Sequence, residues 1–301
     1  MDNLTHSFAG ALLAQMGLKK LSGRATSTLV IAANIPDIDA VASLLGTESL
    51  AIRRGLTHGP IAIAILPLIL TGLVLLWNRW RPVEQPVRPL PLLLCAYIGT
   101  LSHPALDWLN SYGIRLLEPF SSTWYAGDTL FIIDVWIWAA LIGCWIWSRR
   151  RERQGGDWQR PAWLGFAAIG TYIAANGLIT GTAERLTIHA LKEEGRQPTL
   201  VVANPVPLAF WQRTMLWRDV ERYGQAGYVI GRTPFVDQSQ PLHLDHPALA
   251  AARGRKDVKA FLFWSRMPIV VQRDGQLFLA DQRFNSELTR GQFLVPLSSK
   301  P

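Results

Sequence analysis

The sequence has little cysteine and few charged residues, and each of these features excludes some classes of protein. Only 2 of the 301 residues are cysteine, too few for a small scaffold held by disulfides. Charged residues make up 17% of the chain, compared with roughly 25% in soluble domains. Apolar residues reach 49% and include 13 Trp, which excludes an intrinsically disordered chain. The class of protein therefore depends on how the uncharged residues are distributed along the chain.

Four long stretches carry almost no charge and predict transmembrane helices, because a helix needs about 20 apolar residues to cross a bilayer. They are residues 55–78, 89–106, 129–148 and 161–183. Two weaker apolar segments precede them, at residues 3–18 and 25–36. The second weak segment is too short to cross a membrane, so we expect a re-entrant or half-inserted helix there.

The formal net charge of +8 is compatible with a nucleic acid or an anionic membrane surface as partner. The Lys and Arg residues, however, gather between the apolar segments, at residues 19–24, 79–88 and 149–160. Threading the chain back and forth places all three clusters on one side, which the positive-inside rule makes cytoplasmic. We therefore expect a multi-pass membrane protein with these basic loops in the cytoplasm and no nucleic-acid partner.

The last third of the chain has a different pattern. Short β-type runs occur at residues 199–203, 227–230, 259–264 and 276–280, and Arg273-Asp274-Gly275 is a hairpin signal. The sequence thus predicts a mainly α, polytopic membrane helical bundle with four clear spans and two N-terminal helices. A small, mostly β domain on the extracytoplasmic side follows it. We place the membrane-embedded domain at residues 1–184 and the β-rich domain at residues 185–301.

One pair of ionisable residues lies inside a predicted span. His103 and Asp107 are four residues apart, which puts both side chains on one helix face. A histidine and a carboxylate so placed can share a metal ion, or they can form a buried pair that satisfies itself. Ionisable groups within membrane spans are costly and usually functional.

Further candidates come from three other segments that the threading brings to the same outer face. Asp37 and Asp39 lie in a Pro-Asp-Ile-Asp turn, where both can reach one cation or can simply be solvated acids at a helix end. His58 follows Arg53-Arg54, and this arginine pair can clamp a phosphate or flank the membrane. His6 stands near the N-terminus.

Together these candidates form a mixed histidine and aspartate set without cysteine. Such a set suits zinc or manganese and excludes a thiolate-based structural zinc site. The predicted metal ligands are His6, Asp37, Asp39, His58, His103 and Asp107.

Several motifs taken together resemble the YdjM-type inner-membrane proteins, which are described as membrane-bound metal-dependent hydrolases. The resemblance covers roughly residues 1–185. Its motifs are Thr5-His6-Ser7 with Gly10, Asn34-Ile35-Pro36-Asp37-Ile38-Asp39, Arg54-Gly55-Leu56-Thr57-His58, and His103-Pro104-Ala105-Leu106-Asp107 with Asn110-Ser111-Tyr112-Gly113. The order of the motifs is also similar to that of zinc-dependent phospholipase C. The resemblance implies one or two zinc ions, and a third is not expected because no histidine follows His103 until His189.

The resemblance implies hydrolysis by a metal-activated water, with a lipid-derived or lipid-linked phosphoester of the cell envelope as substrate. Whichever of Asp37 and Asp39 is not a full ligand is the candidate general base. Arg54, Arg115 and Asn110 are the candidate substrate-binding residues. A non-catalytic membrane scaffold and a metal or proton transporter are the alternatives, and the sequence leaves the oligomeric state open.

Overall fold

A computed structural model describes residues 1–285 and 293–298 of the chain. It divides into two compact units. The first, here called the helical unit, comprises Met1–Asp39 and Arg54–Gly177, and the second, here called the β unit, comprises Ala40–Arg53 and Leu178–Pro301. The domain bounds at residues 184 and 185 remain a prediction from the sequence.

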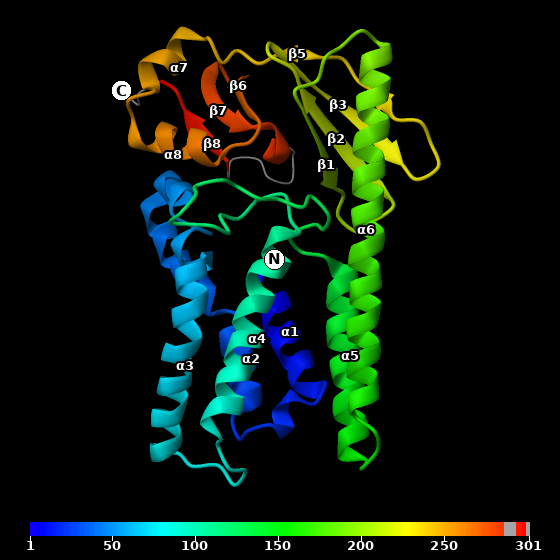
Figure 1. Ribbon diagram of the computed structural model, residues 1–301. Coiled ribbons are helices and arrows are strands. Elements are labelled where there is room, and N and C mark those ends of the chain that lie inside the picture. The colour runs from blue at the N-terminus through cyan, green and yellow to red at the C-terminus, as the bar shows by residue number, and fades with distance from the viewer. Residues whose placement is uncertain (286–292, 299–301) are drawn as a thin grey trace. The chain divides into compact units, whose positions relative to one another are not determined.

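The helical unit is built on a group of packed helices (Figure 1). Its helices are α1 (Asn3–Gln15), α2 (Ala25–Ala32), α3 (Pro60–Trp80), α4 (Pro89–Trp108), α5 (Val135–Arg153) and the first part of α6 (Gln159–Glu193), with short 3₁₀ turns η1 (Leu18–Lys20) and η3 (Leu56–His58). Helix α2 packs against both α1 and α4, while α3 packs on α4 and α5 packs on α1. Both α3 and α4 begin with proline, which suits a first helical position because no intrahelical donor is needed there.

Two glycines allow the central helices to approach closely. A Cβ atom added to Gly10 of α1 would lie 2.6 Å from the carbonyl oxygen of Leu29 in α2. A Cβ atom added to Gly99 of α4 would lie 2.8 Å from the same oxygen. Small residues at helix crossings are typical of membrane bundles. This packing fixes the end of α2, from which Asp37 follows, against the turn of α4 that precedes His103.

Four helical segments are long and apolar enough to cross a membrane. They are Ala25–Ala51, Pro60–Trp80, Pro89–Trp108 and Gln159–Glu193. The last three correspond to predicted spans. The predicted length of the segment at residues 25–36 was wrong, because the helical path continues beyond Pro36 through η2 (Ile35–Ala51), a 3₁₀ segment kinked at Gly46. A re-entrant or half-inserted path for this segment stays a prediction.

The third predicted span, residues 129–148, corresponds to α5 (Val135–Arg153), which is not among these four segments. Asp134 caps its first turn by accepting hydrogen bonds from the amides of Trp136 and Ile137, so the helix begins later than the uncharged run. Arginines occupy its last turn, which shortens the apolar part. A mostly helical chain with four candidate spans and a small antiparallel sheet region still confirms the predicted fold class.

The β unit contains two antiparallel sheets in its described part. The first is formed by β1 (Leu200–Pro205), β2 (Gln212–Arg218), β3 (Arg222–Val229), β4 (Phe235–Val236) and β5 (Gln240–Pro241), and the second by β6 (Pro268–Arg273), β7 (Gln276–Asp281) and β8 (Leu294–Pro296). The remaining elements are α7 (Pro247–Ala252), α8 (Lys256–Trp264) and the 3₁₀ turn η4 (Gln282–Phe284).

The sequence-based strands agree with these elements except at one place. The predicted hairpin joins β6 to β7, with Asp274 and Gly275 at positive φ in the turn. Residues 259–264, predicted as a strand, belong to α8 instead. Val258, Phe261 and Trp264 are buried in α8 at a spacing of three, which is a helical period that a short apolar run conceals.

Candidate metal centre

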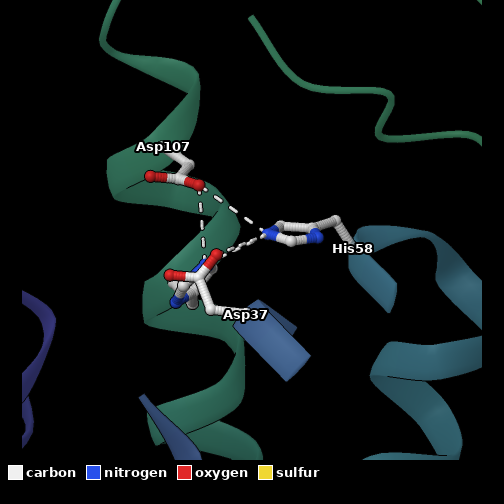
Figure 2. A group of neighbouring side chains, drawn as sticks. Asp37, His58 and Asp107 are labelled. Atoms are coloured by element: carbon white, nitrogen blue, oxygen red, sulfur yellow. Dashed lines mark hydrogen bonds and ion pairs between the residues drawn. The ribbon is translucent and has the colours of Figure 1, made fainter. Parts of the chain in front are cut away.

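Four of the predicted ligands come together from three separate parts of the helical unit (Figure 2). Asp37 lies at the start of η2, just after α2, and His58 ends the short turn η3 that leads into α3. His103 and Asp107 lie one turn apart on the last part of α4. One ligand atom from each of the four residues lies within 4.8 Å of the others.

The separations between these atoms fit a single small cation. His58 Nε2 lies 3.1 Å from His103 Nε2, and these two nitrogens lie 3.7 and 3.5 Å from Asp107 Oδ2. Asp37 Oδ1 lies 3.9 Å from His58 Nε2 and 3.7 Å from His103 Nε2. Ligands held tetrahedrally at about 2.0–2.2 Å from a zinc ion are about 3.3–3.6 Å apart. The side chains of the two histidines and of Asp107 are completely buried.

The hydrogen bonds on the far side of each imidazole determine which nitrogen faces the cluster. His103 Nδ1 lies 2.7 Å from the carbonyl oxygen of Ala33, an acceptor, so Nδ1 carries the proton. His58 Nδ1 lies 2.9 Å from the Thr57 hydroxyl and 3.4 Å from Asp39 Oδ2. In the neutral form both Nε2 atoms therefore present lone pairs, and these face each other at 3.1 Å. A cation between them relieves this repulsion, and the outer hydrogen bonds are those that orient metal-binding histidines.

Asp39 is separated from the four-residue cluster by His58. Its Oδ2 atom accepts hydrogen bonds from the Arg54 amide and the Thr57 hydroxyl, both at 2.8 Å, and faces His58 Nδ1. Asp39 thus contacts His58 on the side of the ring that faces away from the cluster. The sequence alone could not distinguish Asp37 from Asp39, because both lie in the same short turn.

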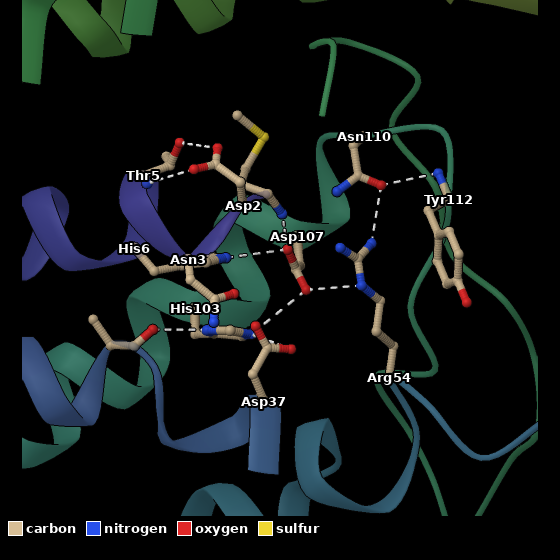
Figure 3. Close-up of polar contacts among 12 residues, drawn as sticks. Asp2, Asn3, Thr5, His6, Asp37, Arg54, His103, Asp107, Asn110 and Tyr112 are labelled. Atoms are coloured by element: carbon tan, nitrogen blue, oxygen red, sulfur yellow. Dashed lines mark hydrogen bonds and ion pairs between the residues drawn. The ribbon is translucent and has the colours of Figure 1, made fainter. Parts of the chain in front are cut away.

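His6 lies on the opposite side of Asp107 (Figure 3). Its Nε2 atom is 3.3 Å from Asp107 Oδ1, and its ring stacks on that of His103 with 3.9 Å between centroids. The amine of Met1 also contacts Asp107 Oδ1. Burial lowers the pKa of His6 well below its ordinary value. Asp107 thus has one oxygen toward the cluster and the other toward His6.

The predicted substrate-binding residues lie beside Asp107 or one step from it. Arg54 is buried, its Nε atom is 3.1 Å from Asp107 Oδ2, and its Nη1 atom donates to Asn110 Oδ1 at 3.0 Å (Figure 3). Arg115 donates its amide to the Arg54 carbonyl, while its guanidinium pairs with Glu118 at 3.0 Å. Arg54 and Asn110 therefore adjoin the cluster directly, and Arg115 does so through the Arg54 backbone.

Sequence reasoning missed two groups that orient the histidines. Thr57 is the neighbour of His58 in the chain, and its hydroxyl links His58 to Asp39. The other group is the backbone carbonyl of Ala33, which orients His103. A backbone carbonyl leaves no signal in the sequence, whereas a hydroxyl residue directly before a candidate ligand histidine could have been singled out.

These features define a helical membrane protein with a buried cluster of histidine and aspartate side chains that suits a divalent cation. The chain belongs to the YdjM inner membrane protein family, whose profile matches residues 1–183. The match includes every residue of the cluster, and together with the four apolar helices it establishes a membrane location. No curated protein and no solved structure matches the chain.

Proposed function

We propose that the protein is a membrane-bound metal-dependent hydrolase that acts on phosphoester bonds. The observation that carries the proposal is the pair of imidazole lone pairs that face each other between the buried carboxylate of Asp107 and the half-buried carboxylate of Asp37. Without a cation, the repulsion between the two lone pairs would remain, or one of the two imidazole rings would have to be protonated. Zinc is the expected ion because two of the donors are imidazole nitrogens, and manganese is the alternative because it accepts the two carboxylates.

The residues that would hold the ion are Asp37, His58, His103 and Asp107. A second ion, if the protein takes one, would use His6 and the outer oxygen of Asp107. When bound, zinc or manganese lowers the pKa of a water molecule and polarises a phosphoryl or acyl oxygen.

The chain supplies the remaining chemistry with its own side chains. Asp39 holds the proton of His58 on Nδ1, which keeps Nε2 directed inward. Arg54 carries a fixed positive charge beside Asp107 and offsets negative charge that develops on a substrate phosphate. Asp37 turns its Oδ1 atom toward both imidazoles, and no residue of the described chain hydrogen-bonds its Oδ2 atom, whereas Asp39 is engaged by three donors. We therefore propose that Asp37 is a ligand through Oδ1 alone and that its free Oδ2 serves as the general base.

The proposed substrate is a lipid-derived or lipid-linked phosphoester. His103 and Asp107 of the cluster lie on the last two turns of α4, a candidate span, where the end of a membrane helix meets the headgroup region. The Arg-rich ends of the helices lie at the other end of α4, and the positive-inside rule places those ends in the cytoplasm. We accordingly propose that the cluster and the β unit are extracytoplasmic. The similarity of the motifs to zinc-dependent phospholipase C stays a prediction from the sequence.

The proposal is tested by metal analysis and hydrolysis on the same preparations. Detergent-purified wild-type protein should contain zinc or manganese by mass spectrometry, and His103→Ala should have lost it. His189→Ala is the matched control, because His189 is an exposed histidine of α6. Hydrolysis of bis(p-nitrophenyl) phosphate should stop after chelation and return with the metal.

The remaining outcomes separate the alternatives. Wild-type protein without metal after expression and reconstitution in zinc would refute the metal centre. Stoichiometric metal with no hydrolysis of any phosphoester would favour a scaffold or a transporter.

A further inference from the structure

A second polar site lies at the other end of the helical unit, where five segments of the chain end or begin. A cavity of about 670 Å³ opens there among η1, the start of α2, the loop after α3, the end of α5 and Trp158, which directly precedes α6. Its charged lining residues are Lys19, Lys20, Arg24, Arg149 and Glu152. The guanidinium of Arg24 is engaged by Asn78 and the Arg81 carbonyl. The other three cations outnumber the single carboxylate, so the cavity attracts anions.

The cations are held in place by contacts that still leave the cavity positive. Glu152 forms ion pairs with Lys19 at 2.5 Å and with Arg149 at 2.8 Å, so a single carboxylate is shared by two cations. The ammonium groups of Lys19 and Lys20 lie 4.0 and 4.8 Å from the centre of the Trp158 ring. Burial lowers the pKa of Lys19, which means that its charge is poorly solvated and gains from a nearby anion.

The first turn of α2 adds hydrogen-bond donors to this positive cavity. Thr26 and Ser27 line it, and in the described part of the chain their amides and hydroxyls have no hydrogen-bond acceptor. Arg24 occupies the N-cap position with a positive φ of 62° and makes no side-chain cap. Unused amides at a helix start, together with hydroxyls and cations, form the donor set that binds phosphate.

The depth of the cavity points to a lipid as the source of the phosphate. Residues 25–51, 60–80 and 89–108 are candidate spans, and the cavity lies where the first and third begin and the second ends. Trp77 and Trp80 at the end of α3 are exposed, as side chains at the headgroup level commonly are. Basic cavities between the ends of membrane helices are typical sites for anionic headgroups.

We propose that this cavity binds the phosphate group of an anionic phospholipid. The site is separate from the histidine and aspartate cluster, since α4 starts beside the cavity and carries His103 and Asp107 about 21–27 Å further along the helix. The proposal does not depend on the hydrolase function.

The test introduces a carboxylate into the cavity without weakening the helix. Thr26→Glu places a negative charge in the first turn of α2, where the helix dipole favours it, and Thr26 is exposed, so the side chain has room. Thr26→Gln is the matched control of equal size without the charge. Full-length protein in detergent is titrated with dioleoylphosphatidylglycerol, with dioleoylphosphatidylcholine or with inorganic phosphate. Native mass spectrometry and the melting temperature report binding.

We expect wild type and Thr26→Gln to bind phosphatidylglycerol with affinities within twofold of each other. We expect Thr26→Glu to bind it about tenfold more weakly, with its melting temperature in lipid-free detergent unchanged. Equal binding by both variants would overturn the proposal, and so would equal retention of phosphatidylcholine. Binding of inorganic phosphate without binding of phosphatidylglycerol would overturn the lipid as its source. If Thr26→Glu does not fold, Lys20→Gln, which changes an exposed cation of the lining, serves in its place.

Discussion

Replacement of Asp39 by asparagine separates a positioning role from a catalytic one. All three donors around Asp39 converge on one oxygen, Oδ2, at 2.8, 2.8 and 3.4 Å. The other oxygen, Oδ1, is buried and has no hydrogen-bond partner in the described part of the chain. An asparagine that keeps its oxygen in the place of Oδ2 therefore retains the contacts with Arg54 and Thr57 but buries an unpaired amide group.

The magnitude follows from two losses. An unpaired buried donor costs about 1–3 kcal/mol of folding stability. The negative charge beside His58 Nδ1 also disappears, and loss of such an outer partner typically weakens metal binding about 10- to 100-fold, or about 1.4–2.7 kcal/mol. We therefore expect Asp39→Asn to bind zinc measurably but weakly, and His103→Ala to lose binding altogether.

The assay is a competition titration of zinc between the purified protein and a chromophoric chelator, with phosphodiester hydrolysis measured at saturating zinc. A positioning role predicts weaker zinc binding and a rate that largely recovers when zinc is saturating. Unchanged zinc affinity with a lost rate would refute this reasoning and make Asp39 the general base. Zinc affinity as low as that of His103→Ala would make Asp39 a ligand.

Two further predictions concern the β unit and the topology. Asp281 is completely buried and pairs with Arg283 at 2.8 Å. Burial alone would raise the pKa of Asp281, but the charge of Arg283 and the hydrogen bonds to the carboxylate hold this pKa below its ordinary value. The stabilisation is therefore complete above the ordinary pKa of about 3.9 and is lost as the pH falls through the lower folded-state value. Asp281→Asn should destabilise the full-length protein by about 3–5 kcal/mol at pH 7. Urea unfolding should show that the difference in unfolding free energy between wild type and this variant shrinks toward pH 3. A difference that stays constant with pH would contradict an ionised Asp281–Arg283 pair. For the topology, a reporter active only in the cytoplasm should give signal when fused at Gln154 and none when fused at the C-terminus, and the reverse pattern would place the cluster on the cytoplasmic side.

The fold was predictable where a single physical quantity decides the structure. Uncharged length alone located α3, α4 and the apolar part of α6, because burial in lipid requires it. The same criterion failed at α5, where Asp134 caps the helix start and shortens the span. It also failed after Pro36, because a 3₁₀ path lets the chain continue where a regular helix would stop.

The cluster was predictable to the level of residues but not of roles. His103 and Asp107 share a helix face by their spacing alone, and the structure brings Asp37 and His58 to them. The distinction between Asp37 and Asp39 depends on where η3 places His58, which is a tertiary contact between segments about 20 residues apart in the sequence. The spacing of two residues in a turn cannot specify which carboxylate faces which ring.

The arrangement of charges around Asp107 shows why these residues act as a unit. Asp107 is completely buried, and one of its oxygens faces Arg54 and the two imidazoles while the other faces His6. A buried carboxylate without such partners would cost several kcal/mol, so Asp107 and its neighbours stabilise one another. Removal of any single member leaves the others uncompensated, and the effects of single substitutions in the cluster should therefore add up to more than the effect of removing the cluster as a whole. Two turns of α4 thus combine a folding requirement with the donor set for a metal ion, which explains how an apolar bundle can retain so many ionisable side chains at one end.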